Sequence, residues 1–345
     1  MKILLTKMKN NYPFRFIVFG LLLLIIPTLA EFDLIQNSSV RIVGYLLIYS
    51  IVALGLNLLL GFSGLISLGT AGFMGFGAYV FINVSEHIYD GFIVALLITL
   101  AISGLVGALI GVLSLRIEGI YLAIGTLFIG EIFIQIFNNV DSFTGGFSGM
   151  GMHYPEINLF FTTLEFDRTQ TFYLIVIVLV IVMIMLYNLI NSRTGRALMA
   201  MSRSEHAAQA MGISIIKYRF IAFITATVLA ALGGVLYVSY FRRVDPSPWN
   251  LNLSLLLIAM VVVGGYKSIF GTIIGALIIY GVPELFLKEW FDALPGSSYI
   301  FSGILIIVVI MFYPHGLIYI GYDIKKLLSK IKHKIKRKKE VRTDE

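Results

Sequence analysis

One carboxylate stands out because it lies inside a long apolar run. Glu131 occurs in "GTLFIGEIFIQIFNN" (residues 125–139), and Gln135 follows four positions later, on the same face of a helix. An ionisable side chain at membrane depth is costly and normally faces protein or water. Two readings stay open: a structural hydrogen bond between helices, or a direct role in binding a substrate or a proton. Asn57, in another apolar run, is a weaker case of the same kind.

Catalytic and metal-binding chemistry has no support in the sequence. The chain has no G-x-x-x-x-G-K-[ST] segment, the loop that cradles ATP phosphates. The five histidines are scattered without ligand spacing, and the absence of cysteine excludes disulfides and thiolate chemistry. No credible Ser/His/Asp arrangement occurs. We therefore predict that this chain is not an enzyme and has no catalytic residue, no metal site and no cofactor of its own.

Small residues are concentrated in "LGLNLLLGFSGLISLGTAGFMGFGAYVF", residues 54–81. Seven glycines recur there at helix-contact spacings, which permits close helix packing in lipid. The same density also fits a broken or re-entrant helix whose unwound backbone lines a substrate path. The sequence favours the second reading. The predicted pathway residues are Asn57, Gly61, Ser63, Gly64, Ser67, Gly69, Thr70, Gly75, Gly77 and Glu131.

The elements that must position these residues are membrane-spanning helices. The chain has 345 residues, 58% of them hydrophobic and 13% charged, and its mean hydropathy is +0.92. Soluble domains carry about 25% charged residues, and a helix needs about 20 apolar residues to cross a bilayer. The fold class is therefore an all-α, polytopic transmembrane helical bundle with about ten spans (range eight to eleven). The predicted spans are 15–30, 42–60, 71–84, 91–115, 120–137, 171–190, 219–240, 251–265, 270–287 and 299–318.

The distribution of basic residues predicts the orientation. With the N-terminus inside, 21 of the 26 Lys and Arg residues fall on inner segments, and eleven against five remain when the tail is left out. Because cytoplasmic loops carry the excess of Lys and Arg, both termini are predicted to be cytoplasmic. The basic start before the first apolar run also fits a signal peptide, but "TLA" before Glu31 is a poor cleavage site. We expect an uncleaved first span.

Two segments outside the spans are long enough to matter. The outer loop 138–170 mixes glycines with acidic and apolar residues, and it is either a docking surface or a flexible connector. The tail 323–345 has an apolar helical stripe among lysines, which predicts an amphipathic helix on anionic lipid and no nucleic-acid partner. The domain division is thus 1–322 for the transmembrane domain, with an inner loop at 191–218, and 323–345 for the basic tail.

The inner loop contains a polar segment patterned like a helix, "RTGRALMAMSRSEHAAQAMGISIIKYR" (residues 193–219). Glu205, Ala208 and Gly212 stand at i, i+3 and i+7 on one helical face, and Ala207 adds another small side chain. Small residues permit close approach of another surface, a single acid among arginines such as Arg203 sets its register, and Gly212 can end the helix in a left-handed conformation. This pattern predicts a short helix that fits a groove on a cytoplasmic partner.

The segment resembles a known docking element. Its glutamate, alanine pair and later glycine resemble the EAA loop by which ABC importer permeases engage their ATPase subunits. The longer string "GRALMAMSRSEHAAQAMGI" is similar to the version in LivM-type permeases for branched-chain amino acids. Further strings stand in that family's order over residues 45–320: "LGLNLLLGFSGLISLGTAGFMGFGAY", "LRIEGIYLAIGTLFIGEI", "NNVDSFTGGFSGM", "MVVVGGYKSIFGTIIGALI" and "FYPHGLI".

The resemblance implies a permease subunit of an ATP-driven amino-acid importer, in the cytoplasmic membrane of a bacterium or archaeon. It implies a LivH-like second permease, two cytoplasmic ABC ATPase subunits that bind ATP and Mg²⁺, and an external solute-binding protein that meets loops such as 138–170. The ATPase-coupling residues would be Arg203, Glu205, Ala207, Ala208 and Gly212.

Two positions depart from the family pattern. His206 separates the acid from the alanine pair, which bears on the individual part of Glu205. Thr70 stands where family members often carry histidine, which bears on substrate specificity. The rival hypothesis is an ion-coupled secondary transporter that uses Glu131 as its proton or sodium site.

Overall fold

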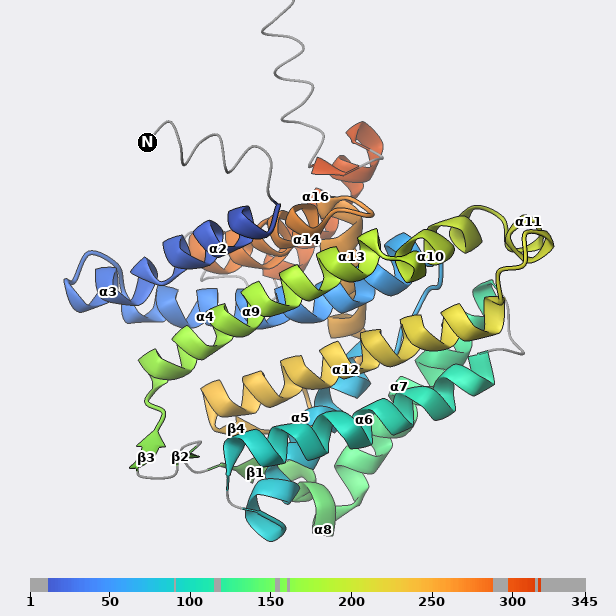
Figure 1. Cartoon of the computed structure of the whole chain (residues 1–345). Helices are drawn as coiled ribbons and strands as arrows, with labels where there is room; N and C mark the ends of the chain where they lie inside the picture. Colours follow the sequence, from blue (N-terminus) through green and yellow to red (C-terminus); the bar gives the residue numbers. More distant parts are fainter. Residues whose placement is uncertain are drawn as a thin grey trace, which may run out of the picture.

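The computed structural model of the chain describes residues 12–89, 91–114, 119–152, 156–159, 162–287, 297–313 and 316–317. Over this part the chain is mostly helical, and its long helices run roughly parallel or antiparallel to one another (Figure 1). The predicted tail 323–345 lies outside the described residues.

Every predicted span range holds a helix. These helices are α2 (Tyr12–Leu23) with α3 (Ile25–Glu31), α4 (Asn37–Asn57) continued by the π-helix η1 (Leu58–Phe62), α5 (Thr70–His87), α6 (Phe92–Ser114), α7 (Ile120–Asn139), α9 (Arg168–Asn191), α12 (Ile215–Phe241), α13 (Leu251–Gly264), α14 (Ile269–Ala276) continued by the π-helices η3 (Leu277–Gly281) and η4 (Pro283–Leu287), and α16 (Ser297–Phe312). Six of the described helices are long and apolar enough to cross a membrane, whereas α13 and the helix over 269–285 are shorter apolar helices. The chain is a polytopic helical bundle.

The core of the bundle is formed by α4, α5 and α12. The most apolar windows of α4 and α12 are 83% and 78% buried, against 22–33% for the other four long helices. Glycines bring α5 and α12 together, because a Cβ at Gly77 meets the backbone of Ala231 and a Cβ at Gly234 meets the carbonyl oxygen of Met74. Helices packed this closely gain van der Waals contact that lipid alone does not supply. The outer helices present apolar faces instead, as expected in lipid.

The segment between α7 and α9 is folded where it is described. Thr144 ends the short helix α8 (Asp141–Thr144) and donates a buried hydrogen bond to the carbonyl of Phe137, at 2.8 Å. Asn83 of α5 donates to the carbonyl of Phe143. After the 3-10 turn η2 (Gly146–Ser148), β1 (Met150–Gly151) pairs antiparallel with β4 (Arg243–Val244). Residues 139–152 are thus held to α5 and to the strand that follows α12. A flexible connector would not have such contacts.

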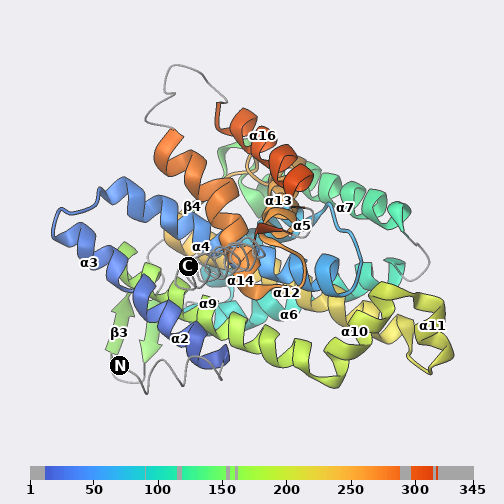
Figure 2. The ribbon, with the colours of Figure 1, turned by 90° about the horizontal axis from the view of Figure 1, so that it is seen from above.

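Short strands are a feature that the all-α prediction did not contain. Besides the β1–β4 pair, the strands β2 (Glu156–Leu159) and β3 (Thr162–Glu165) form an antiparallel pair that leads to α9. Figures 1 and 2 place this hairpin at the opposite end of the bundle from α10 (Arg193–Arg203) and α11 (Glu205–Ala210). The two sets of loops therefore lie at opposite ends of the long helices.

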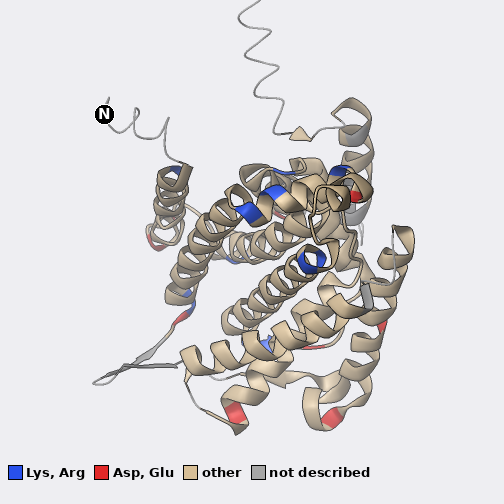
Figure 3. Ribbon diagram, turned by 45° about the vertical axis from the view of Figure 1, so that its right-hand side comes forward, with Lys and Arg blue, Asp and Glu red and all other residues tan. Residues whose placement is uncertain are grey.

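Charged residues are sparse along the helices, and most of the ribbon carries none (Figure 3). The basic residues of α4, α9 and α12 lie near helix ends: Arg41, Arg168, Lys217 and Arg219. Glu131 is the exception, because it lies near the middle of α7. Charge placement of this kind is what a bilayer requires of a spanning bundle.

Candidate functional site

The polar segment between α9 and α12 consists of two short helices. α10 follows directly after α9, where the Ser192 side chain caps it by accepting a hydrogen bond from the Thr194 amide. Ser204 then adopts an extended conformation, ends α10 and caps α11, accepting from the Ala207 amide at 3.3 Å. The predicted short helix is therefore α11, which a break at Ser204 separates from α10. A serine favours such a break because its hydroxyl replaces a backbone partner.

Gly212 ends α11 as predicted. It has a φ of +79°, and its amide donates to the carbonyl of Gln209 while the Ile213 amide donates to the carbonyl of Ala208. These two bonds form a Schellman motif, in which a left-handed glycine reverses the chain after a helix. The reversal returns the chain to the start of α12. Nothing lies within 4 Å of the position that a Gly212 Cβ would occupy, so the turn is open on its outer side.

The face that contains Glu205 and Ala208 packs against this chain itself. Glu205 forms an ion pair with Arg219 of α12, whose side chain is only 4% exposed. Ala208 is also buried. Two members of the predicted docking face are therefore turned toward this chain, because the reversal at Gly212 folds α11 back toward α12. The coupling role of these residues stays a prediction.

The opposite side of α11 is the exposed one. His206, Ala207, Gln209 and Ala210 are exposed there, Arg203 is exposed at the end of α10, and Gly212 is exposed at the turn. Met211 is 82% exposed at the tip. Figures 1 and 2 show α11 at one end of the bundle, beyond the end of α12, with α10 leading to it. His206, the residue that departs from the family pattern, thus adds to the exposed face while Glu205 points inward.

The polar segment also contacts the glycine-rich region. Lys267, between α13 and α14, donates through Nζ to the Ser202 hydroxyl at 3.4 Å. Gly64 packs against Ser202, since a Cβ at Gly64 would lie 3.4 Å from Ser202 Cα. The end of α10 therefore touches both the segment that follows η1 and the turn that precedes α14.

The glycine-rich region is a broken helix. After η1 the chain is non-helical from Ser63 to Gly69, with Gly64 at a φ of +75°, and α5 begins at Thr70. Neighbouring helices satisfy the freed backbone: Thr126 of α7 accepts from the Leu68 amide at 2.9 Å, and Ser254 of α13 accepts from the Ala71 amide at 3.0 Å. Irregular backbone at membrane depth is tolerated only with such partners. The break that the sequence suggested is present.

The polar side chains of the break are buried. Ser63 is 2% exposed and donates to the carbonyl of Leu58, and Ser67 and Thr70 are 3% and 6% exposed. Gly69 lies against the carbonyl of Thr126 and against Gly130, so α7 approaches the break at backbone contact. The break is thus enclosed by α7 and α13 on the sides that these contacts describe.

Asn57 has a full set of structural partners. Its amide group donates to the Ser268 carbonyl at 3.1 Å and to the Thr272 hydroxyl at 2.8 Å, and its oxygen accepts from the Lys267 amide at 3.2 Å. Gly61 leaves room for this side chain, because a Cβ there would collide with the Asn57 oxygen. Asn57 therefore fastens the end of α4 to the turn before α14.

Gly75 and Gly77 are close-packing residues. A Cβ at Gly75 would lie 2.7 Å from both Phe137 and Trp249, and Gly77 lies against the Ala231 backbone of α12. Both positions are buried. Of the two interpretations of the glycine-rich region, the contacts of these two glycines support close helix packing.

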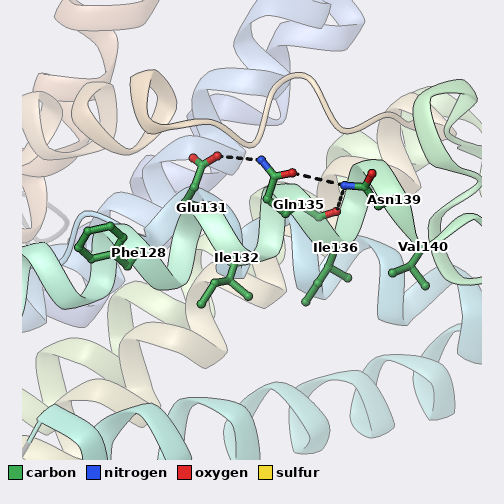
Figure 4. A pocket seen from close by; sticks show the side chains of 7 residues that line it. All are labelled: Phe128, Glu131, Ile132, Gln135, Ile136, Asn139 and Val140. Carbon is green, nitrogen blue, oxygen red and sulfur yellow. Dashed lines mark hydrogen bonds between the residues drawn. The ribbon is translucent and has the colours of Figure 1, made fainter.

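Glu131 lies on the open side of α7. Gln135 donates to its carboxylate at 3.1 Å, and Asn139 donates to the Gln135 side-chain oxygen at 3.3 Å and to the Gln135 carbonyl at 2.8 Å. Figure 4 shows these three side chains following one another along one side of the helix. They line a hollow of about 440 Å³ together with four apolar residues of α7: Phe128, Ile132, Ile136 and Val140. All three polar side chains are exposed in the single chain.

Several residues of this arrangement did not emerge from the sequence. The sequence pattern does not single out Arg219 and Lys267 beyond their charge, and it does not single out Ser202, Thr126 or Ser254. The signal for Arg219 was its place inside an apolar run, two residues after Lys217. In the part of the chain that the structure covers, no three His, Cys, Asp or Glu residues are grouped to hold a metal ion.

Comparisons with known proteins give a consistent result. The family described as "Branched-chain amino acid transport system / permease component" matches residues 38–310. The high-affinity branched-chain amino acid transport system permease protein LivM of Salmonella typhimurium is 30% identical over 87% of this chain and 74% of its own length. LivM of Escherichia coli is 30% identical over 83% and 71%. The probable permease protein LivH of Methanocaldococcus jannaschii is 27% identical over 56% and 55%. No solved structure matches.

Proposed function

Since the chain belongs to the family of permease components of branched-chain amino acid transport systems, we propose that it moves amino acids with branched or other apolar side chains across the cytoplasmic membrane of a bacterium or archaeon. The family forms the membrane subunit of ABC importers. One observation carries the proposal furthest: α11 projects at one end of the bundle, and α11 and α10 contact α12 and the helix break, respectively. A docked motor protein can therefore act directly on the membrane helices.

The proposed complex contains this chain, a LivH-like second permease, two ABC ATPase subunits and an external solute-binding protein. The likeness to the M. jannaschii LivH protein supports pairing of related permeases. ATP and Mg²⁺ are bound by the ATPase subunits. The folded segment 139–152 and the β1–β4 pair lie at the end of the bundle opposite α11, where the binding protein would dock. The orientation with both termini cytoplasmic follows from the charge count.

The exposed side of α11 is the proposed docking face for the ATPase. It comprises Ala207 and Gly212, with Arg203 before it and Met211 at its tip. Glu205 and Ala208 serve coupling from the inner side, because they hold α11 on α12. When the ATPase subunits close, α11 moves, and the Glu205–Arg219 ion pair transmits that movement to α12, a core helix.

A second route leads to the pathway. Ser202 touches Gly64 and Lys267, and the Lys267 amide bonds Asn57. Movement of α10 therefore reaches the break at 63–69 directly. We propose that Gly61, Ser63, Gly64, Ser67, Gly69 and Thr70 form the part of the pathway that changes between outward and inward access, with Asn57, Gly75 and Gly77 as its packing supports.

Uptake driven by ATP tests this function. The complete complex is reconstituted in proteoliposomes with ATP inside and radiolabelled leucine on the binding protein outside, and the ion gradients are collapsed with ionophores. We expect uptake to persist and to stop when the ATPase subunits carry a disabled ATP site. Uptake that stops with the ionophores instead would support the ion-coupled rival, in which Glu131 binds the coupling ion.

A further inference from the structure

Glu131 is an exposed carboxylate near the middle of α7, where contact with lipid would be energetically costly. Glu131 is the twelfth of the twenty residues of α7. At 1.5 Å per residue it lies about 16 Å from one end of the helix and about 12 Å from the other. A carboxylate at the centre of a spanning helix costs about 3 kcal/mol or more in contact with lipid. The open side of α7 around Glu131 must therefore face water or another protein.

The hydrogen bonds of this stripe point in one direction. Asn139 donates to Gln135, and Gln135 donates to one carboxylate oxygen of Glu131. The Asn139 amide polarises the Gln135 amide, and the Gln135 amide in turn becomes a stronger donor to Glu131. The chain of hydrogen bonds thus ends at the Glu131 carboxylate. No Lys, Arg or His among the described residues pairs with Glu131. Its second oxygen accepts no bond from the described residues and is available to a cation.

The hollow beside the carboxylate combines this acceptor with apolar walls. All seven lining residues belong to α7: Phe128 lies one turn before Glu131, and Ile132, Ile136 and Val140 project from a different side of the helix than the three polar side chains (Figure 4). The hollow is open on its outer side, and its lining is mostly apolar with a few polar groups, which is the composition of small-molecule sites. One anionic group beside an aliphatic surface is complementary to a ligand with an ammonium group and an aliphatic side chain.

We propose that this hollow is one wall of a transient binding site for the translocated amino acid, in which Glu131 binds the ammonium group and Ile132, Ile136 and Phe128 contact the apolar side chain. The second permease subunit supplies the opposite wall, because α7 is open on this side in the single chain. The proposal rests on the proposed function and adds a substrate-contacting residue to it. Gln135 and Asn139 are positioning residues that orient the carboxylate.

The absence of cysteine from the chain allows a direct test. Gln135→Cys is prepared in the complete complex with cysteine-free partner subunits, in proteoliposomes, and its rate of modification is measured with a cationic and an anionic methanethiosulfonate reagent. We expect the cationic reagent to react at least about tenfold faster, because the neighbouring carboxylate attracts it. The preference should vanish in the double variant with Glu131→Gln, and loading the path with leucine should slow the reaction. Leu105→Cys, on the exposed apolar side of α6, is the control and should not react.

Uptake provides the second readout. Glu131→Gln should lower leucine uptake about tenfold or more, because a charged hydrogen bond to the substrate is lost, and Glu131→Asp should restore part of it. Glu86→Gln makes the same chemical change at an exposed position of α5 outside the stripe and should transport like the wild type.

The outcomes separate this inference from the proposed function. Wild-type uptake that does not depend on ATP would refute the function itself. ATP-driven uptake with a Gln135→Cys variant that neither reagent modifies would place the stripe in a dry subunit contact and overturn the inference alone. Modification without charge preference, or full transport by Glu131→Gln, would also overturn it.

Discussion

Glu205 and Glu131 are both carboxylates of a largely apolar chain, and their surroundings are opposite. Glu205 is paired within the chain, with an arginine that is almost fully buried. Glu131 receives a hydrogen bond from Gln135 and forms no ion pair with any described residue. The first charge is neutralised before any partner arrives, so it serves the structure of the subunit. The second keeps a carboxylate oxygen that accepts no hydrogen bond from the described residues, which is why we propose a ligand from outside the chain for it.

The same contrast holds for the two predicted sites as wholes. In the polar segment, caps at Ser192 and Ser204 and the turn at Gly212 determine the chain path locally. The inner face of α7 is packed against the helix break, while the outer face, which contains Glu131, is exposed in the single chain. Substitutions at Glu205 should therefore change stability and coupling, whereas those at Glu131 should change transport alone.

The largest expected effect on stability is that of Glu205→Gln. It removes the carboxylate that pairs with the mostly buried Arg219 guanidinium, which we expect to cost about 2 kcal/mol. This is less than for a fully buried pair, because the Glu205 side chain is 33% exposed and water screens it. The measurement is the thermal unfolding midpoint of the purified subunit in detergent.

A double variant isolates the pair. Adding Arg219→Leu to Glu205→Gln also removes the buried positive charge and should recover part of the lost stability. If Glu205→Gln alone left the midpoint unchanged, the ion pair would not hold α11 on α12, and the contrast with Glu131 would fail.

The second prediction concerns the turn that folds α11 back. Gly212→Val places a β-branched residue at a φ of +79°, which costs about 1–2 kcal/mol and displaces α11. Gly212→Asn is the matched control, because asparagine tolerates the left-handed region. We expect ATPase subunits to co-purify poorly with the valine variant and normally with the asparagine variant. Equal loss in both would indicate that contact at Gly212, which is open outward, matters more than the turn.

A smaller effect is expected at the tip of α11. Met211→Ala removes an exposed apolar side chain that we expect the ATPase to bury, and should weaken its binding about fivefold without changing stability. Ile216→Ala, at the start of α12, also removes an exposed apolar side chain and serves as the control. The affinity of the permease for its ATPase is measured directly. An unchanged affinity for Met211→Ala would move the docking face away from the tip.

The sequence alone predicted the positions of the helices, because apolar runs bounded by polar residues are a local signal. It also predicted the left-handed conformation of Gly212 and the break near Gly64, since glycine density reports local backbone demands. It did not predict which acid is neutralised. The Glu205–Arg219 pair depends on a chain reversal, and the partners of Asn57 lie more than 200 residues away in the chain. Such pairings arise from tertiary packing, which periodicity does not encode.

The smallest expected stability effect is that of Glu131→Gln, and it separates the two glutamates most sharply. A glutamine at this position still accepts a hydrogen bond from Gln135, and no buried cation loses its partner. The thermal midpoint should therefore stay within the range of surface substitutions, about 0.5 kcal/mol. The same isosteric change is expected to cost about 2 kcal/mol at Glu205, because there it removes the carboxylate that pairs with a buried guanidinium. A large loss of thermal stability in Glu131→Gln would mean that the carboxylate is bonded inside the permease. Its charge would then stabilise the fold, as we expect for Glu205.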